Sequence, residues 1–204
     1  MPVKEDLLRS LPGYAARKGR FDVVNLPARR YLMIDGHGDP NTSPAYADAL
    51  ATLYPVAYRL KFLSREAGHD YRVMPLEALW WADDLTAFTA ARDKSAWKWT
   101  VLNLVPDWIL GEQVEQALAG VQDAGKAPVP ERLRVESFTE GMAVQTLHVG
   151  SYDDEGPVLE RLHHEVIPAH GLRLTGRHHE IYLNDARRTA PQRLRTILRQ
   201  PVVG

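Results

Sequence analysis

The chain has 204 residues, of which 45% are hydrophobic, and its 25 basic and 26 acidic residues nearly cancel. This composition is typical of a globular protein with one substantial core, and the balanced charge gives no indication of a nucleic-acid partner. The absence of cysteine excludes disulfides, thiolate chemistry and cysteine-based zinc sites. No apolar run has the length of a signal-peptide core or a membrane span, so we expect a cytoplasmic protein without a membrane partner.

The first half of the chain is predicted to form a strand, a helix and two further strands, after an N-terminal helical extension over residues 1–20. The strand RRYLMIDGHGD, residues 29–39, precedes a helical segment over 44–66 whose apolar residues recur at three- and four-residue steps. Pro55 interrupts this stripe, which predicts either a kink or two helices in series. A strand pair that ends in YRVMPLEALWW then follows. Between the halves, SAWKWTVLNLV predicts a further strand, and GEQVEQALAGVQDAG is typical of a short amphipathic helix.

The second half repeats the order of the first. The segment AVQTLHVGSYDD, residues 143–154, predicts a strand, residues 155–169 an amphipathic helix, and the segment ending in GRHHEIYLND a strand pair. In this repeat Glu77 corresponds to Glu180. A capping pattern that begins at Thr189 predicts a C-terminal helix.

The duplication predicts a single α+β domain made of two strand-helix-strand-strand modules related by a pseudo-twofold axis. Residues 21–125 would form the first module, with an insertion, and residues 126–204 the second, with the C-terminal helix. We expect antiparallel sheets with helices on one side and an aromatic cleft on the other.

The segment HHEIYL places an acid in the middle of a strand. Because side chains alternate along a strand, His178, Glu180 and Tyr182 should share one face, while Ile181 shares the other face with Leu183. We expect the aliphatic face to meet the helices and the acidic face to line the cleft. A carboxylate beside aromatic rings is costly to desolvate, so such a group is expected to have a raised pKa, a hydrogen-bond partner or a cationic ligand.

The order of these segments resembles the GyrI-like small-molecule-binding superfamily, and most of all its stand-alone members. The resemblance covers nearly the whole chain from Phe21 onward and rests on RRYLMIDGHGDP, MPLEALWW, WKWTVLNLVPDW, LHVGSYDDEGP and HHEIYLNDARRTAPQRLRTILRQPV taken together. It implies a duplicated module with an aromatic-lined cleft and an acidic residue on the last strand that contacts hydrophobic, often cationic, aromatic small molecules. Glu180 matches that position.

Some members of this superfamily hydrolyse the cyclopropane of cyclopropanoid DNA-alkylating compounds, and the resemblance implies this activity here. Glu180 is then the candidate base for the attacking water, and Tyr182 would orient that water or donate to the substrate carbonyl. Further residues are expected to bind the ligand: Glu77, Trp81, Trp97, Trp99, His178 and Tyr152.

A second class of function stays open, in which the protein binds or sequesters such molecules without turnover, as a multidrug-binding or gyrase-inhibitor-like protective protein. Without the resemblance, Glu180 reads as a solvated strand residue and the tryptophans as core. Adjacent histidines on a strand point to opposite faces, and no HExxH-like spacing occurs, so neither a metal nor another cofactor is expected. The sequence does not determine the oligomeric state.

Overall fold

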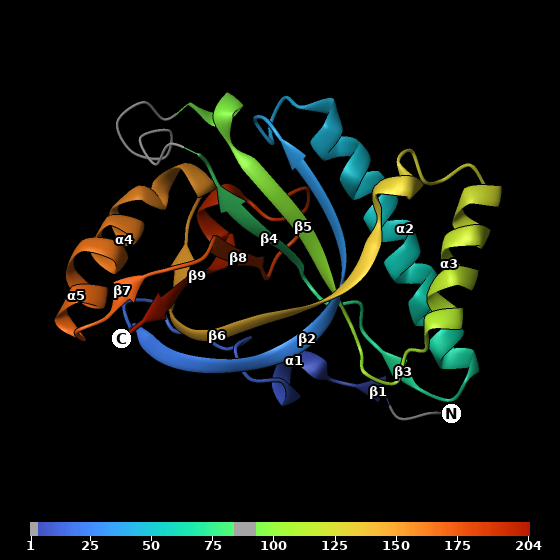
Figure 1. Ribbon diagram of the computed structural model, residues 1–204, viewed down its shortest axis with the longest axis horizontal. Coiled ribbons are helices and arrows are strands. Elements are labelled where there is room, and N and C mark those ends of the chain that lie inside the picture. The colour runs from blue at the N-terminus through green and yellow to red at the C-terminus, as the bar shows by residue number, and fades with distance from the viewer. Residues whose placement is uncertain (1–3, 84–92) are drawn as a thin grey trace. The chain divides into compact units, whose positions relative to one another are not determined.

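The computed structural model describes residues 4–83 and 93–204 (Figure 1). The chain divides into two compact units that take segments alternately from the sequence. The first unit is formed by Met1–Ser10, Arg29–Met74 and Trp80–Phe138, and the second by Leu11–Ala28, Pro75–Leu79 and Thr139–Gly204. Strands β2 (Asp22–His37), β4 (Leu76–Trp81) and β6 (Arg134–Val149) contribute residues to both units. The predicted modules, in contrast, are continuous in sequence.

The first unit combines a strand pair with two long helices. Within it, β2 pairs with β5 (Lys98–Val105) in antiparallel register, and the short strands β1 (Lys4–Glu5) and β3 (Asp70–Tyr71) pair in parallel. Helices α2 (Pro44–Glu66) and α3 (Gly111–Asp123) lie side by side in Figure 1. The stripe predicted for α2 is confirmed, because its buried side chains include Leu53, Val56, Leu60 and Leu63.

Helix α2 continues through Pro55, so the two-helix alternative is wrong. The proline lacks only one backbone N–H group, and the buried apolar stripe on both sides of it gives the helix tertiary packing. Packing of this face therefore outweighs the local cost of the proline.

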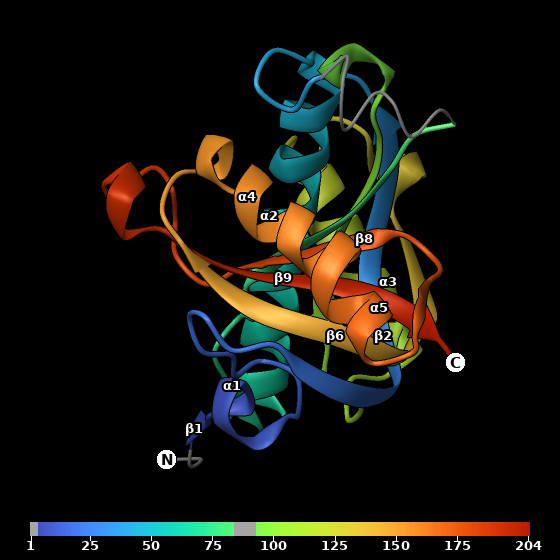
Figure 2. The same ribbon diagram turned by 90° about the vertical axis from the view of Figure 1, so that its left-hand side faces the viewer.

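The second unit is built on β9 (Arg195–Val203), which pairs antiparallel with β6 on one side and with β8 (His178–Tyr182) on the other. The short strand β7 (Arg173–Leu174) also pairs with β9. A helical segment made of α4 (Gly156–Arg161), one π-helical stretch (Leu162–Val166) and α5 (Ile167–Ala169) lies over these strands (Figure 2). The helix predicted over 155–169 is thereby confirmed.

This helical segment packs on the face of the strands that carries Glu180, which corrects the expectation that the aliphatic face meets the helices. Leu162 and Ile167 form a core cluster with Val144 of β6 and Val202 of β9. The rings of His163 and His178 lie 6.2 Å apart between helix and strand. The expectation failed because the apolar residues that attract the helix lie on β6 and β9, and not on β8 itself.

The C-terminal segment is also corrected, since the predicted helix is strand β9. Only a 3₁₀ turn, Pro191–Arg193, occupies the expected helix start. From Thr196 to Val202 every side chain is buried, as in a strand that is covered on both faces and paired on both edges. Of the predicted N-terminal helical extension, residues 4–20 contain one α-helical turn, α1 (Leu7–Ser10).

The strands and helices together confirm the α+β class and the antiparallel pairing of the main strands. Short 3₁₀ turns complete the described elements: Lys94–Ala96, Pro130–Arg132 and Tyr152–Asp154. Within residues 4–83 and 93–204, no helix combines the length and the apolar character that crossing a membrane requires.

We expect Gly36→Ala to destabilise the first unit. Gly36 lies opposite Trp99 in the β2–β5 register, and a Cβ at this position would overlap the fully buried indole ring. Overpacking of this kind costs about 1–3 kcal/mol in the free energy of unfolding, measured by urea denaturation. Gly120→Ala in α3 is the matched control, because its Cβ would meet only Arg59 Nε at 3.7 Å and should stabilise the helix by up to about 1 kcal/mol. Equal effects of the two substitutions would contradict the close approach of Trp99.

Candidate functional site

The two faces of strand β8 meet different environments within the second unit. As predicted from alternation, His178, Glu180 and Tyr182 share one face, while His179 and Ile181 are fully buried on the other. We call the residues on and above the first face the Glu180 group: Tyr152, Glu155, His178, Glu180 and Tyr182. The residues around His179 form a second set, the His179 network: Tyr14, Glu77, Glu140, His179 and Arg199.

Both carboxylate oxygens of Glu180 face a neighbour on its own strand. The Tyr182 hydroxyl donates a hydrogen bond of 2.6 Å to Oε2, and His178 Nε2 lies 3.4 Å from Oε1. The Glu180 and His178 side chains each keep 14% of their surface exposed. Glu180 is therefore held in one orientation by its strand neighbours while a small part of it stays accessible.

An aromatic pair flanks this acid. The ring of Tyr152, from the turn before α4, lies 5.5 Å from the ring of Tyr182 in an edge-to-face arrangement of 74°. Tyr152 is 41% exposed. The predicted site residues Tyr152, His178, Glu180 and Tyr182 are thus brought together.

Glu155 is the residue of this group that the sequence did not indicate. It directly precedes α4 and is only 5% exposed, and the Thr196 hydroxyl on β9 interacts with its carboxyl group. Burial, followed by the negative charge of Glu180, raises the pKa of Glu155 to about 10. An acid at a helix start has an ordinary capping interpretation, so no local signal distinguishes it.

Some buried polar atoms beside the Glu180 group lack hydrogen bonds to the described residues. They are Nε2 of His163 and Nδ1 of His178. Burial, with the neighbouring His178 and His164 acting in the same direction, lowers the pKa of His163 to about 4, so this ring is neutral at pH 7. Buried polar groups in proteins are usually hydrogen-bonded, and a concentration of unsatisfied ones is suited to bound water or a polar ligand.

The His179 network fills the opposite face with paired charges. His179 lies between two carboxylates, with Nε2 at 2.9 Å from Glu77 Oε2 and Nδ1 at 2.5 Å from Glu140 Oε2. Arg199 Nη1 donates to the same Glu140 oxygen at 2.9 Å, and the Tyr14 hydroxyl donates to Glu77 Oε1 at 2.5 Å. Two acids thereby face two bases in a site where Glu77 and His179 have no exposed surface.

The pKa values of this network reflect the pairing. Burial alone would lower the pKa of His179, but the charges and hydrogen bonds of Glu140 and Glu77 raise it to about 9. Burial would raise the pKa of Glu140, but His179 and Arg199 outweigh it and lower the pKa to about 2. The ions therefore stabilise one another across the neutral pH range.

The network also places Glu77 away from the Glu180 group. The repeat in the sequence predicted equivalent acids, but Glu77 contacts His179, whose side chain points to the opposite face of β8 from that of Glu180. Its fully buried carboxylate is already paired, so nothing in this arrangement offers it to a ligand.

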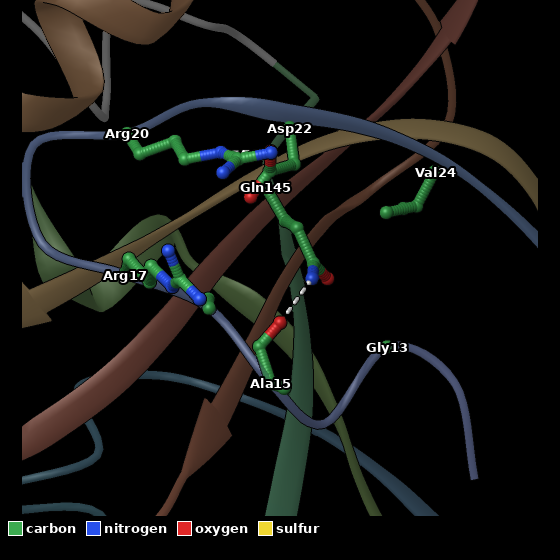
Figure 3. Close-up of a pocket in the computed structure, with 8 residues that line it drawn as sticks. Gly13, Ala15, Arg17, Arg20, Asp22, Val24 and Gln145 are labelled. Carbon is green, nitrogen blue, oxygen red and sulfur yellow. Dashed lines mark hydrogen bonds and ion pairs between the residues drawn. The ribbon is translucent and has the colours of Figure 1, made fainter.

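Residues of the N-terminal segment cover the network and form a shallow hollow of about 390 Å³ above it (Figure 3). Arg199 Nη2 donates to the Gly13 carbonyl at 2.6 Å, and Gln145 Nε2 donates to the Ala15 carbonyl at 2.9 Å. Two arginines line the hollow, and Arg20 is engaged by Asp22 at 2.6 Å. No residue of the Glu180 group lines it, so this hollow is distinct from the candidate site.

The tryptophans predicted to bind ligand belong to the first unit. Trp99 is fully buried and meets the ring of Tyr46 edge-on at 4.9 Å, and Trp97 packs against Trp80 at 5.7 Å. Trp81 and Trp97 are half-buried. The predicted cleft that joins these rings with Glu180 stays a prediction.

Within residues 4–83 and 93–204, no group of three or more histidine, aspartate or glutamate side chains is arranged to hold a metal ion.

Comparisons with known proteins agree with this fold. The family described as "GyrI-like small molecule binding domain" matches residues 20–203. An uncharacterized conserved protein from Listeria innocua shares 31% identity, with a TM-score of 0.86 over 98% of this chain and 100% of its own. A hydrolase from Listeria innocua shares 30% identity, with a TM-score of 0.83 over 98% of this chain and 100% of its own.

More distant structures share the fold alone. The C-terminal domain of EcmrR is 11% identical, with a TM-score of 0.56 over 90% of this chain and 97% of its own. No curated protein matches the chain.

The His179 network predicts a specific pH dependence of stability. His179 titrates near 6.5 in the unfolded chain and near 9 in the folded protein. Its contribution to the free energy of unfolding is therefore fully present below pH 6.5 and is lost as pH rises through 9. We expect the stability difference between the wild type and His179→Gln to shrink by about 3 kcal/mol over this window.

Urea denaturation at a series of pH values measures this difference, with His37→Gln, at an exposed position, as the control. The control should show no comparable change. A difference between wild type and His179→Gln that stays constant from pH 6.5 to 9 would show that His179 is not held in its charged form.

Proposed function

Because the chain belongs to the family of GyrI-like small molecule binding domains, we propose that the Glu180 group binds hydrophobic aromatic small molecules and hydrolyses cyclopropanoid electrophiles among them. The observation that carries this proposal is the Glu180 carboxylate, held by Tyr182 at 2.6 Å beside unsatisfied buried polar atoms. The similarity to a hydrolase from Listeria innocua at 30% identity supports the same reaction class.

The proposed reaction adds water across one strained carbon–carbon bond. Glu180 takes a proton from a water molecule as its oxygen attacks the methylene carbon of a cyclopropane fused to a dienone. The bond between this methylene and the ring carbon breaks, and its electron pair moves to the dienone oxygen, which becomes a phenolate. The phenolate then takes up one proton and Glu180 releases one, so the net change is the addition of water.

Tyr182 has an orienting task in this scheme. Its hydroxyl hydrogen is donated to Glu180 Oε2, which leaves Oε1 to face the water. His178 lies on the Oε1 side at 3.4 Å and lines the same space. Tyr152, which is 41% exposed, would contact the aromatic part of the ligand.

The second candidate function is binding without turnover, in which the protein sequesters hydrophobic or cationic aromatic molecules. A carboxylate next to tyrosine rings is suited to this task, since both attract aromatic cations. The two functions use the same residues and differ in whether product is released catalytically.

Substitution of Glu180 separates the two functions. We expect Glu180→Gln to retain binding of a cyclopropane-fused dienone and to lower multiple-turnover hydrolysis by about a hundredfold or more, because the amide cannot take the proton of water. Product formation followed by mass spectrometry and affinity measured by calorimetry give the two readouts. Glu165→Gln, at an exposed position in the helical segment, is the matched control and should leave both unchanged.

Two outcomes would contradict the hydrolytic proposal. Undiminished turnover in Glu180→Gln would remove this residue from the chemistry. Stoichiometric protection without product release by the wild type would favour sequestration.

A separate proposal concerns the tryptophans of the first unit as ligand-binding residues. Trp81 and Trp97 are half-buried, whereas Trp99 has no exposed surface, so we expect the first two to contact a flat ligand. Such a ligand should quench tryptophan fluorescence, and Trp81→Ala should weaken its binding by about tenfold, as loss of one aromatic stacking partner implies. An unchanged titration curve in Trp81→Ala would exclude this indole from the site.

A further inference from the structure

The hollow beside the N-terminal segment has the size and the charge of a second ligand site. It lies within the second unit, and its volume of about 390 Å³ is in the range of small-molecule pockets. Its lining combines small apolar side chains with charged ones (Figure 3): Ala15, Ala16 and Val24, and Arg17, Arg20 and Asp22. Because two bases face one acid, the hollow is suited to a ligand with negative charge.

A tight turn brings the two arginines of the hollow together. The Arg20 backbone N–H donates to the Arg17 carbonyl at 3.2 Å. Gly19, the third residue of this turn, has a φ of 77°, the left-handed value that this position of a type II turn requires. The first and fourth Cα atoms of such a turn lie within about 7 Å of each other. The guanidinium groups of Arg17 and Arg20 can therefore reach the same group of a ligand.

The segment that carries this turn is held on strand β6. Gln145 Nε2 on β6 donates to the Ala15 carbonyl at 2.9 Å. Three residues further along the segment, Lys18 forms a parallel backbone bridge with Leu147 of the same strand. The position of the turn is therefore set before a ligand binds, which lowers the entropic cost of binding.

Most N–H donors of the two guanidinium groups have no acceptor within the described part of the chain. No side chain in residues 4–83 and 93–204 pairs with that of Arg17. Arg20 uses its Nε atom for Asp22, at 2.6 Å, which leaves its two terminal nitrogens for a ligand. A guanidinium group binds the oxygens of a carboxylate or phosphate through two parallel hydrogen bonds, so both side chains can recognise such a group.

We propose that this hollow is a binding site for a small molecule with a carboxylate or phosphate group. Arg17 and Arg20 hold the anionic group, and a short aliphatic part of the ligand lies against the small apolar side chains of the lining. Asp22 lines the same hollow and limits the negative charge that the site accepts. The site does not depend on the proposed hydrolysis, because no residue of the Glu180 group lines it.

Three probes that share one aliphatic chain test the charge preference at constant ionic strength: butyrate, butyl phosphate and butylammonium. Heteronuclear NMR follows the backbone amides of Gly13 and Gly19, with Gly125 of the first unit as the reference. We expect saturable shifts at Gly13 and Gly19 with one or both anions, with a dissociation constant on the order of 1 mM, and none with butylammonium. The anion that binds more tightly shows whether the natural ligand carries a carboxylate or a phosphate.

Substitutions of opposite charge should change anion binding in opposite directions. Arg17→Gln should weaken it by about tenfold, because charge-assisted hydrogen bonds are lost. Asp22→Asn should strengthen it by about threefold, because it removes a negative charge and releases Arg20. Arg188→Gln, at an exposed position outside the hollow, is the matched control and should leave binding unchanged.

The variants should fold like the wild type, which thermal unfolding verifies. Arg17 has no side-chain partner among the described residues, and Arg20 and Asp22 form an exposed ion pair of the kind that contributes little to stability. Shifts that rise without saturation, equal shifts for butylammonium and the anions, or unchanged anion affinity in Arg17→Gln would each overturn the inference.

Discussion

The ion pairs around His179 are the interaction on which the candidate site depends. His179 contacts Glu77 on one side and Glu140 on the other, and Arg199 joins β9 to the same acid. Removal of one partner from a buried set of this kind leaves an uncompensated charge, which is far more costly than loss of a surface pair. The His179 network therefore holds strand β8 in place from one face. Because Glu180 lies on the other face of the same strand, its backbone position is held as well.

The acids on the two faces of strand β8 have different surroundings. The acids of the His179 network contact His179, Arg199 and Tyr14, whereas Glu180 contacts a tyrosine and a histidine of its own strand and keeps 14% of its surface exposed. Where buried polar groups lack hydrogen bonds, the position is often a functional site, and other interactions in the fold offset the energetic cost. A strand that is held from one face and carries a partly exposed acid on the other is suited to hold a reactive or ligand-binding group in one geometry.

Periodicity predicted what depends on neighbours in sequence. The stripe of α2, the helix that begins after Glu155, and the shared face of His178, Glu180 and Tyr182 follow from steps of three, four or two residues. The sequence predicted a helix in place of strand β9, because the capping pattern before it involves only neighbouring residues. The strands that pair with β9, β6 and β8, lie elsewhere in the chain. Pairing between strands that are far apart in the chain cannot be recognised from the residues of one short segment.

The roles of the acids were harder to predict for the same reason. The repeat made Glu77 equivalent to Glu180, but Glu77 is paired with Tyr14 and His179, neither of which is near it in sequence. Glu155 has the ordinary place of an acid at a helix start, and only its burial against Glu180 makes it unusual. Residue type and spacing therefore identify candidate acids, and the tertiary partners decide which of them are paired.

Glu77, Glu155 and Glu180 have the same side chain, but their surroundings differ and so do their hydrogen bonds and exposure. Glu77 is held between a tyrosine and a histidine, so its carboxyl group is already paired within the protein. Glu180 keeps some exposure and a hydroxyl donor, while Glu155 is buried against that acid and keeps its proton. Two ionised carboxylates in one poorly hydrated space would repel each other, so the arrangement favours one donor beside one acceptor.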